Sequence, residues 1–279
     1  MLLYLNDQFL NEAKAGISVN NRSFRYGDGC FETMKLYKGR VLQADLHMER
    51  LWHSLQLLQF EPPTWFTPDY ILQRSTELAQ RNQHAALARI RCTVFRGDGG
   101  LYDAANMRPH LLLQSWALNP ENNKLNSNGL VLDIYSHGHK ACDALANLKS
   151  NNYLLYGMAA LAAKQQHTND MLVLNQHGRL ADSTIANLWW REGDTIFTPA
   201  LTEGPVAGTM RRYLLQQLPQ HGYQVQEDSA SPERLLAADE VWLSNAIYGI
   251  KWVRQLGQRS YGLQVAASIH QQVLAPLWA

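Results

Sequence analysis

The spacing of hydrophobic residues in the first part of the chain changes between the periods of strands and helices. Residues 1–10, MLLYLNDQFL, predict a strand hairpin with the Asn-Asp pair at its turn. Residues 29–60 predict two strands joined at KGR and then a helix, because Leu51, Leu55 and Leu58 fall on one helical face. The elements expected after them are a helix over 68–83 and strand-rich segments over 85–100 and 108–118. Roughly the first 115 residues therefore predict an α+β unit.

A polar stretch rich in asparagine, NPENNKLNSNG, interrupts this pattern and predicts an interdomain linker over residues 118–129. Strand and helix patterns alternate again after it. The expected strands are 130–138, 170–182, 183–192, 194–200 and 240–253, and the expected helices are 151–166, 208–222 and 231–239. The chain is therefore predicted to be an α/β protein with a small α+β domain over 1–117 and a larger α/β domain over 130–279.

Charge and cysteine content narrow the classes of function. The 25 basic and 24 acidic residues give a formal charge of +1, without the basic excess typical of proteins that bind nucleic acid or membrane surfaces. No apolar run approaches the roughly 18 residues of a membrane span, and no export signal opens the chain, so a cytoplasmic protein is expected. Three widely spaced cysteines indicate neither a disulfide framework nor a metal site. A small molecule is the expected partner.

Lys149 lies in the segment ANLKSNNYLLYGMAALAAK, just before an expected helix. A lysine in this position is most often a solvated surface group. It becomes a candidate for chemistry only if other segments supply what a reactive lysine needs.

The segment TPALTEGPVAGTMRRYLL supplies a candidate anion site. Gly208, Thr209 and Met210 open an amphipathic helix, where backbone N–H groups and the positive end of the helix dipole favour phosphate. An ordinary glycine at a loop-helix junction explains the same residues. The spacing of a Walker loop is absent.

Several polar residues elsewhere leave a structural and a functional reading open. Asp182 and Asn187 bound the stretch DSTIAN, where the acid is either a turn residue or the partner of a heterocyclic nitrogen. Arg50 on a predicted helix and Arg96 before a glycine-rich turn are surface residues or binders of phosphate and carboxylate. Asn245, after Ser244 at a strand end, is a cap or part of an anion site.

Taken together, a lysine, a phosphate cradle, an arginine and an acid are the inventory for pyridoxal 5'-phosphate. The order of these motifs over most of the chain resembles the fold-type IV, or class IV, pyridoxal-phosphate enzymes, which include branched-chain and D-amino acid aminotransferases and aminodeoxychorismate lyases. The motifs that carry the resemblance are YGDGCFE, HMERL, LKSNN, DSTIAN and GTMR.

The resemblance assigns roles residue by residue. It places the Schiff-base lysine at Lys149 and the phosphate contacts at Arg50, Gly208, Thr209, Met210 and Asn245, with Arg211 closing the GTMR motif. It places the acid-to-asparagine segment at Asp182 through Asn187. It assigns substrate positioning to Arg96 and to the strand from Tyr26 to Glu32, which includes Phe31.

Two positions depart from the family pattern. The family usually has glutamate where this chain has Asp182, whose side chain is one methylene shorter. The tyrosine that follows the lysine by five residues in the aminotransferases is here Tyr153, four residues after Lys149. Whether Asp182 reaches the pyridine nitrogen, and whether Tyr153 contacts the cofactor, stay open.

The details RGDGG, LKSNNYL and SNA resemble the lyase more than the aminotransferases. The resemblance therefore implies 4-amino-4-deoxychorismate lyase activity, which releases pyruvate and the folate precursor 4-aminobenzoate from an amine substrate. The alternatives are a branched-chain or D-amino acid aminotransferase and a non-catalytic small-molecule-binding protein on the same scaffold. The family further implies a homodimer with active sites near the subunit interface.

Overall fold

The computed structural model describes residues 1–102 and 106–278, which form two compact units. The first unit comprises Met1–Pro120 and Leu148–Tyr153, and the second comprises Glu121–Asn147 and Leu154–Ala279. The sequence-based division placed the segment with Lys149 in the domain that follows the linker. In the structure this segment belongs to the first unit, because Phe31 N–H donates to the Lys149 carbonyl and Asn151 N–H donates to the Gly29 carbonyl, both at 2.9 Å.

The first unit is built on a six-stranded antiparallel sheet with the order β2-β1-β6-β5-β3-β4. Its strands are β1 (Leu2–Leu5), β2 (Gln8–Asn11), β3 (Gly29–Tyr37), β4 (Arg40–Val41), β5 (Leu87–Phe95) and β6 (His110–Ala117). In the long β3–β5 ladder Phe31 lies opposite Thr93 and Thr33 lies opposite Arg91. Successive side chains of a strand alternate between faces, so Phe31 and Arg91 share one face of this sheet.

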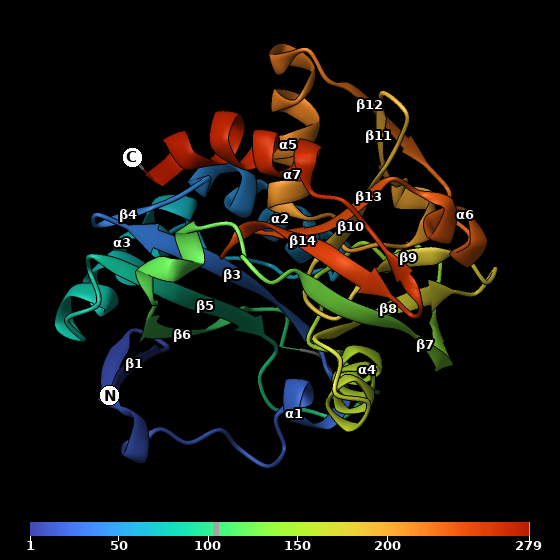
Figure 1. Ribbon diagram of the computed structural model, residues 1–279. Helices are drawn as coiled ribbons and strands as arrows, with labels where there is room; N and C mark the ends of the chain where they lie inside the picture. The colour runs from blue at the N-terminus through green and yellow to red at the C-terminus, as the bar shows by residue number, and fades with distance from the viewer. Residues whose placement is uncertain (103–105, 279) are drawn as a thin grey trace. The chain divides into compact units, whose positions relative to one another are not determined.

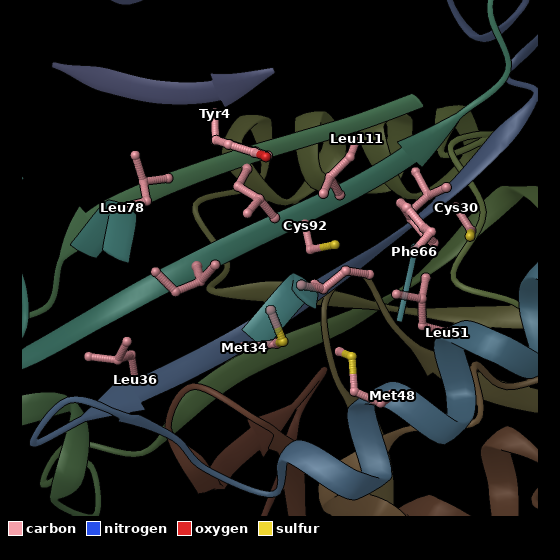
Figure 2. Packing of buried hydrophobic residues seen from close by; sticks show 14 of the residues in the cluster. Tyr4, Cys30, Met34, Leu36, Met48, Leu51, Phe66, Leu78, Cys92 and Leu111 are labelled. Carbon is pink, nitrogen blue, oxygen red and sulfur yellow. The ribbon is translucent and has the colours of Figure 1, made fainter. Parts of the chain in front are cut away.

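Helices α2 (Ala44–Leu57) and α3 (Pro68–Arg81) pack on the sheet of the first unit, close to where the leucine spacing predicts them. Thr67 caps α3 by accepting the Tyr70 N–H, with proline at the first helical position. Figure 2 shows Met48 and Leu51 of α2 beside Met34 of β3 in the hydrophobic core of this unit. Each such buried side chain contributes roughly 1.5–3 kcal/mol of hydrophobic free energy. The short helices of the unit are η1 (Glu12–Lys14) and α1 (Arg22–Tyr26).

The second unit is built on a nine-stranded sheet, drawn from green to red in Figure 1. Its strands are β7 (Leu130–Lys140), β8 (Asp170–Asn175), β9 (Leu180–Ser183), β10 (Asn187–Glu192), β11 (Thr195–Pro199), β12 (Gln224–Asp228), β13 (Glu240–Asn245), β14 (Gly249–Leu256) and β15 (Arg259–Ser260). Because β9 pairs with both β8 and β10, the six strands β10-β13-β14-β7-β8-β9 close into a ring. The closure places Asp182 directly opposite Asn187.

Helices surround this ring and include the expected helix after Gly208. The helices of the second unit are η2 (Pro120–Asn123), α4 (Leu154–Gln165), η3 (Leu201–Glu203), α5 (Thr209–Gln217), η4 (Pro219–His221), α6 (Pro232–Ala237), α7 (Gln264–Ile269), η5 (His270–Leu274) and η6 (Ala275–Trp278). Helix α4 packs on β7 and β8, and α5 packs on β13. Within the described ranges, no helix has both the length and the apolar character needed to cross a membrane. Both units thus mix helices and sheet, as the sequence predicts.

Candidate active site

Lys149 lies on the short segment that accompanies β3 in the first unit, before α4 begins. An isolated bridge joins Ser150 to Cys30 and holds this segment against the strand. The Lys149 ammonium lies 4.5 Å from the centre of the Phe31 ring and 5.6 Å from that of Tyr153. A cation over an aromatic face is attracted by the ring quadrupole. Phe31, predicted to position substrate, therefore lies beside the candidate lysine.

A second cation, which the sequence interpretation missed, lies on the same ring. The guanidinium carbon of Arg91 is 3.7 Å from the centre of the Phe31 ring. Burial lowers the pKa of Arg91, and Tyr153 partly opposes that shift. Among the described residues no carboxylate forms an ion pair with Arg91. Two cations that share one aromatic ring make this part of the first unit suited to an anionic ligand. The alternation of RIRCTVF, which puts Arg91 on one face with Thr93, is the sequence signal that predicts its direction.

Glu32 joins Arg50 and His47 in a buried cluster of the first unit. Arg50 donates from Nε to Glu32 Oε1 at 2.7 Å and from Nη2 to Oε2 at 2.5 Å, while His47 Nδ1 lies 2.7 Å from Oε2. Burial opposes ionisation of Glu32, but Arg50 and His47 outweigh it and lower the pKa of this carboxyl to about 2. The cluster therefore fixes the direction of the Arg50 guanidinium.

Arg96 and Tyr26 occupy other parts of the first unit. Arg96 is 5% exposed and donates to Asp28 Oδ1 at 3.1 Å, to the Met107 sulfur at 2.8 Å and to the Leu58 carbonyl. Because these contacts engage the Arg96 guanidinium within the fold, the Arg91 guanidinium is the better candidate for contact with a ligand. Tyr26 ends α1 at the surface, where the Arg25 guanidinium lies 5.0 Å from its ring centre.

Asp182 is the centre of a buried group in the second unit. The Tyr156 hydroxyl lies 3.0 Å from both carboxylate oxygens, and Val206 N–H donates to Oδ2 at 2.8 Å. The Lys140 ammonium lies 3.6 Å from Oδ2. Asp182 itself is 2% exposed. Neither Tyr156 nor Lys140 was predicted from the sequence as part of the site, since only the fold brings them to the acid.

The start of α5 forms a narrow cradle beside Asn187. A Cβ atom placed on Gly208 would lie 1.8 Å from Asn187 Oδ1, so only glycine fits at this position. Asn187 Nδ2 donates to the Val206 carbonyl at 2.8 Å, and no side chain caps α5 at Gly208. The first N–H groups of an α-helix have no partner within the helix. With the amides of Thr209 and Met210, this helix start has the donor set for a phosphate.

Asn147 and Glu203 hold the loop that leads to this cradle. Asn147 Nδ2 donates to the carbonyls of Leu201 at 2.9 Å and Pro205 at 2.7 Å, and its own carbonyl accepts from Ala207 N–H. The buried Glu203 accepts from Arg179 Nη2 at 2.9 Å. Neither residue was predicted from the sequence as a support of the phosphate loop.

The remaining predicted residues serve structural contacts. Asn245 Oδ1 accepts from Ile247 N–H at 3.0 Å and Tyr248 N–H at 3.1 Å, and so caps the turn between β13 and β14. Ser244 accepts from Trp189 Nε1 at 2.9 Å. Arg211 donates to the Pro199 carbonyl at 2.8 Å and to Glu227.

Each unit, taken by itself, has residues that suit part of pyridoxal 5'-phosphate. The second unit has a cradle that a Cβ atom would fill, and a buried carboxylate, Asp182, that accepts from the N–H of Val206 in the loop before this cradle. The first unit has a lysine beside aromatic rings and an arginine held in place. In the described part of the chain, no three His, Cys, Asp or Glu side chains gather as metal ligands would.

Comparison with known proteins identifies the family. The chain matches the model described as class IV amino-transferase over residues 29–256. It is 31% identical over 270 residues to an aminodeoxychorismate lyase of Bacillus subtilis (strain 168), across 94% of this chain and 89% of the relative. It is 30% identical over 236 residues to an aminodeoxychorismate lyase of Vibrio harveyi, across 84% and 85% of the two chains.

A solved branched-chain amino acid aminotransferase from Escherichia coli has the same fold. It is similar with a TM-score of 0.88 at 21% identity, over 100% of this chain and 94% of that chain. This match confirms the predicted fold-type IV architecture. The chain belongs to the class IV aminotransferase family, and it is a pyridoxal 5'-phosphate-dependent enzyme, as its sequence predicts.

Proposed function

We propose that this enzyme is a 4-amino-4-deoxychorismate lyase that releases pyruvate and 4-aminobenzoate. The observation that carries this choice is the similarity of 31% and 30% to two aminodeoxychorismate lyases across most of the chain. The motifs RGDGG, LKSNNYL and SNA favour the same activity. The geometry within each unit supports the residue roles and is compatible with either reaction of the family.

In this proposal Lys149 carries the cofactor and then moves protons. Pyridoxal phosphate, when bound, takes up the electron pair left by proton loss beside the substrate nitrogen. Lys149, once displaced by the substrate amine, is the base that removes this proton. Phe31 and Tyr153 orient the lysine, since its ammonium lies 4.5 and 5.6 Å from their ring centres.

The residues that we assign to the cofactor's phosphate and pyridine ring are fixed by contacts with neighbouring residues. Thr209 and Met210 offer amides at the start of α5, beside the Gly208 cradle that Asn187 closes. Arg50, fixed by Glu32, adds a guanidinium for the phosphate. Asp182 is the acceptor for the ring nitrogen, and Asn245 supports the same site by holding its turn.

A substrate carboxylate meets the Arg91 guanidinium beside Phe31. We assign a carboxylate contact to Arg91, because its guanidinium lies over Phe31 near Lys149, whereas Arg96 is engaged by Asp28, Met107 and Leu58. Tyr26 precedes Phe31 along the chain and Glu32 follows it. Glu32 contributes by fixing the direction of Arg50. The Arg91 guanidinium suits one carboxylate of the substrate, because Lys149 is engaged by the cofactor and by proton transfer.

The first test separates an enzyme from a binding protein. Purified protein reconstituted with pyridoxal phosphate should be yellow, and Lys149→Ala should lose the visible band. Lys164→Ala, which changes an exposed lysine at the end of α4, is the control and should keep it. A colourless wild-type protein would contradict the proposal and favour a non-catalytic scaffold.

The second test separates lyase from aminotransferase. The enzyme is incubated with aminodeoxychorismate alone and, separately, with L-leucine or D-alanine plus 2-oxoglutarate. Release of pyruvate and 4-aminobenzoate without a keto acid is the expected result. Formation of glutamate instead would assign aminotransferase activity, and the L or D form of the product would identify the branched-chain or D-amino acid subgroup.

We also propose that the enzyme is a homodimer whose active sites lie near the subunit interface. The exposed apolar residues Ile17, Val19 and Phe24 of the first unit are available for such a contact. Sedimentation of the holoenzyme should give twice the mass of the chain. A monomeric species that retains full activity would contradict this arrangement.

A further inference from the structure

Lys140 is a buried cation that the proposed reaction does not use. It ends β7 in the second unit with 9% of its surface exposed. Its ammonium lies 3.6 Å from Asp182 Oδ2 and 5.3 Å from the centre of the Tyr156 ring. Among the described residues no hydrogen-bond acceptor reaches this ammonium. Its partners are therefore one carboxylate and the face of one aromatic ring.

Burying an ammonium group destabilises the folded protein unless a partner compensates its charge. Desolvation disfavours an ammonium in this setting by several kcal/mol, and a hydrophobic residue of similar size would avoid that cost. Burial lowers the pKa of Lys140, whereas Asp182 and, more weakly, Cys142 and Asp143 raise it. Asp182 is thus the main group that favours the charged form of Lys140.

The contacts of Asp182 are unevenly divided between its two oxygens. Oδ2 faces Tyr156, Val206 N–H and Lys140, whereas the one contact of Oδ1 among the described residues is the shared Tyr156 hydroxyl. A carboxylate oxygen accepts about two hydrogen bonds. Oδ1 therefore keeps capacity for one more donor, and Oδ2 does not.

We propose that Lys140 is a positioning residue that keeps Asp182 ionised and its Oδ1 available to the ring nitrogen of the cofactor. The inference rests on the proposed role of Asp182 as the ring partner. It also explains how the shorter acid serves in place of glutamate, since a carboxylate fixed on three sides cannot turn away. The hydrogen bonds from Tyr156 and Val206 orient the Asp182 carboxylate, and the ammonium of Lys140 compensates its negative charge.

Loss of the cation has a directional consequence. Without Lys140, the buried Asp182 carboxylate loses the cation that lies 3.6 Å from its Oδ2, and burial without a cation favours the neutral form of a carboxyl group. A neutral carboxyl no longer supplies the negative charge that stabilises a protonated ring nitrogen. The titratable groups around the pair are Tyr156 on α4 and Cys142 and Asp143 after β7, while the facing residues Val173 and Asn187 of β8 and β10 carry no charge.

The test measures cofactor binding to the apo-protein by tryptophan fluorescence, from about pH 5 to about pH 8.5. The variants are Lys140→Met, Lys140→Gln and Lys140→Arg. The control is Lys35→Met, which removes another buried lysine from the first unit. We expect the Met and Gln variants to lose affinity at a pH about 1–3 units higher than the wild type does, and Arg to restore the wild-type profile.

A second ligand separates positioning from general destabilisation. A pyridoxal phosphate analogue with carbon in place of the ring nitrogen has no donor for Asp182. Wild type and Lys140→Met should bind this analogue equally at every pH. A purely structural role would weaken both ligands to the same extent and would overturn the inference.

The outcomes also separate this inference from the proposed function. Wild-type protein that fails to bind pyridoxal phosphate would contradict the function itself. Wild-type protein that binds, with an unchanged pH profile in both neutral variants, would contradict only the role of Lys140. If Lys140→Met fails to fold, Lys140→Gln carries the test: a Lys140→Gln profile for pyridoxal phosphate that matches the wild-type profile contradicts the inference.

Discussion

Glu32 in the first unit and Asp182 in the second are both buried carboxylates beside a cation, yet the two units use these pairs in different ways. Glu32 in the first unit receives three charge-assisted contacts from Arg50 and His47 at 2.5–2.7 Å. Asp182 in the second unit receives hydrogen bonds from neutral groups, and its cation stays 3.6 Å away. Glu32 is fully occupied, whereas Asp182 keeps an oxygen with spare capacity.

This difference separates support from chemistry. A carboxylate saturated by an arginine fork fixes the direction of that arginine and accepts nothing further. A carboxylate held by a tyrosine, an amide and a distant lysine remains an acceptor for a ligand. Burial is the same in both places, so the choice of neighbours sets the role.

The largest effect should come from removing the charge of Glu32. Glu32→Gln removes the buried negative charge that the Arg50 guanidinium and His47 contact, and breaking such a pair typically costs about 3–5 kcal/mol of unfolding free energy. Urea denaturation measures the change. The control Glu77→Gln, at a half-buried surface pair with Arg74 and Arg81 on α3, should cost about 1 kcal/mol or less. Equal effects in the two variants would remove the distinction between them.

The same carboxylate should make stability depend on pH. The folded-state pKa of Glu32 is lowered to about 2. Its stabilisation is therefore complete above the unfolded pKa of about 4.3 and is lost as the pH falls toward about 2. The wild type should lose about 3 kcal/mol across this window more than Glu32→Gln does. Parallel acid denaturation curves for the two proteins would contradict the assignment.

The next effect should appear in catalysis. Asp182→Asn keeps the size of the side chain but removes the negative charge that the ring nitrogen needs, so kcat should fall by about 10²-fold, equivalent to about 2.7 kcal/mol. Steady-state pyruvate release measures it. Asp170→Asn changes another buried acid, on β8, that is bonded to Thr184 at 2.6 Å, and should leave kcat within a few-fold. Retention of kcat in Asp182→Asn would refute the proposed role.

The sequence predicted local elements better than the contacts between them. Leucine spacing predicted α2, and the glycine before TMRR predicted α5, because these signals lie within one turn or one helix of the chain. The expected strands 170–182 and 183–192 are instead divided at other residues, since β9 pairs with both β8 and β10. No local pattern encodes that closure.

The site shows the same limit. Motif order predicted Lys149, Asp182 and the Gly208 cradle as residues worth testing. It did not predict that the Lys149 segment pairs with β3, because the bonded residues are separated by more than 100 positions in the chain. Lys140 and Tyr156 were missed for the same reason: only folding brings them to Asp182.

A smaller effect should distinguish the two arginines of the first unit. Arg91→Met removes a cation beside Phe31 and Lys149, so KM for a dicarboxylate substrate should rise about tenfold, equivalent to about 1.4 kcal/mol, with kcat little changed. Arg96→Met should lower the unfolding temperature instead, because it breaks contacts to Asp28 and Leu58. A rise in KM confined to Arg96→Met would reverse the assignment of the carboxylate contact.

The smallest effect should come from Tyr156, which distinguishes direction from charge around Asp182. Tyr156→Phe removes one hydroxyl shared between both carboxylate oxygens, at a cost of about 1 kcal/mol in stability. Lys140 still lies 3.6 Å from Asp182 in this variant, so the pH profile of cofactor binding should stay that of the wild type while kcat falls less than tenfold. Lys140→Met should show the opposite pattern, a displaced pH profile at similar stability cost. If Tyr156→Phe displaces the pH profile as far as Lys140→Met does, the ionisation of Asp182 depends on its hydrogen bonds and not on the buried cation.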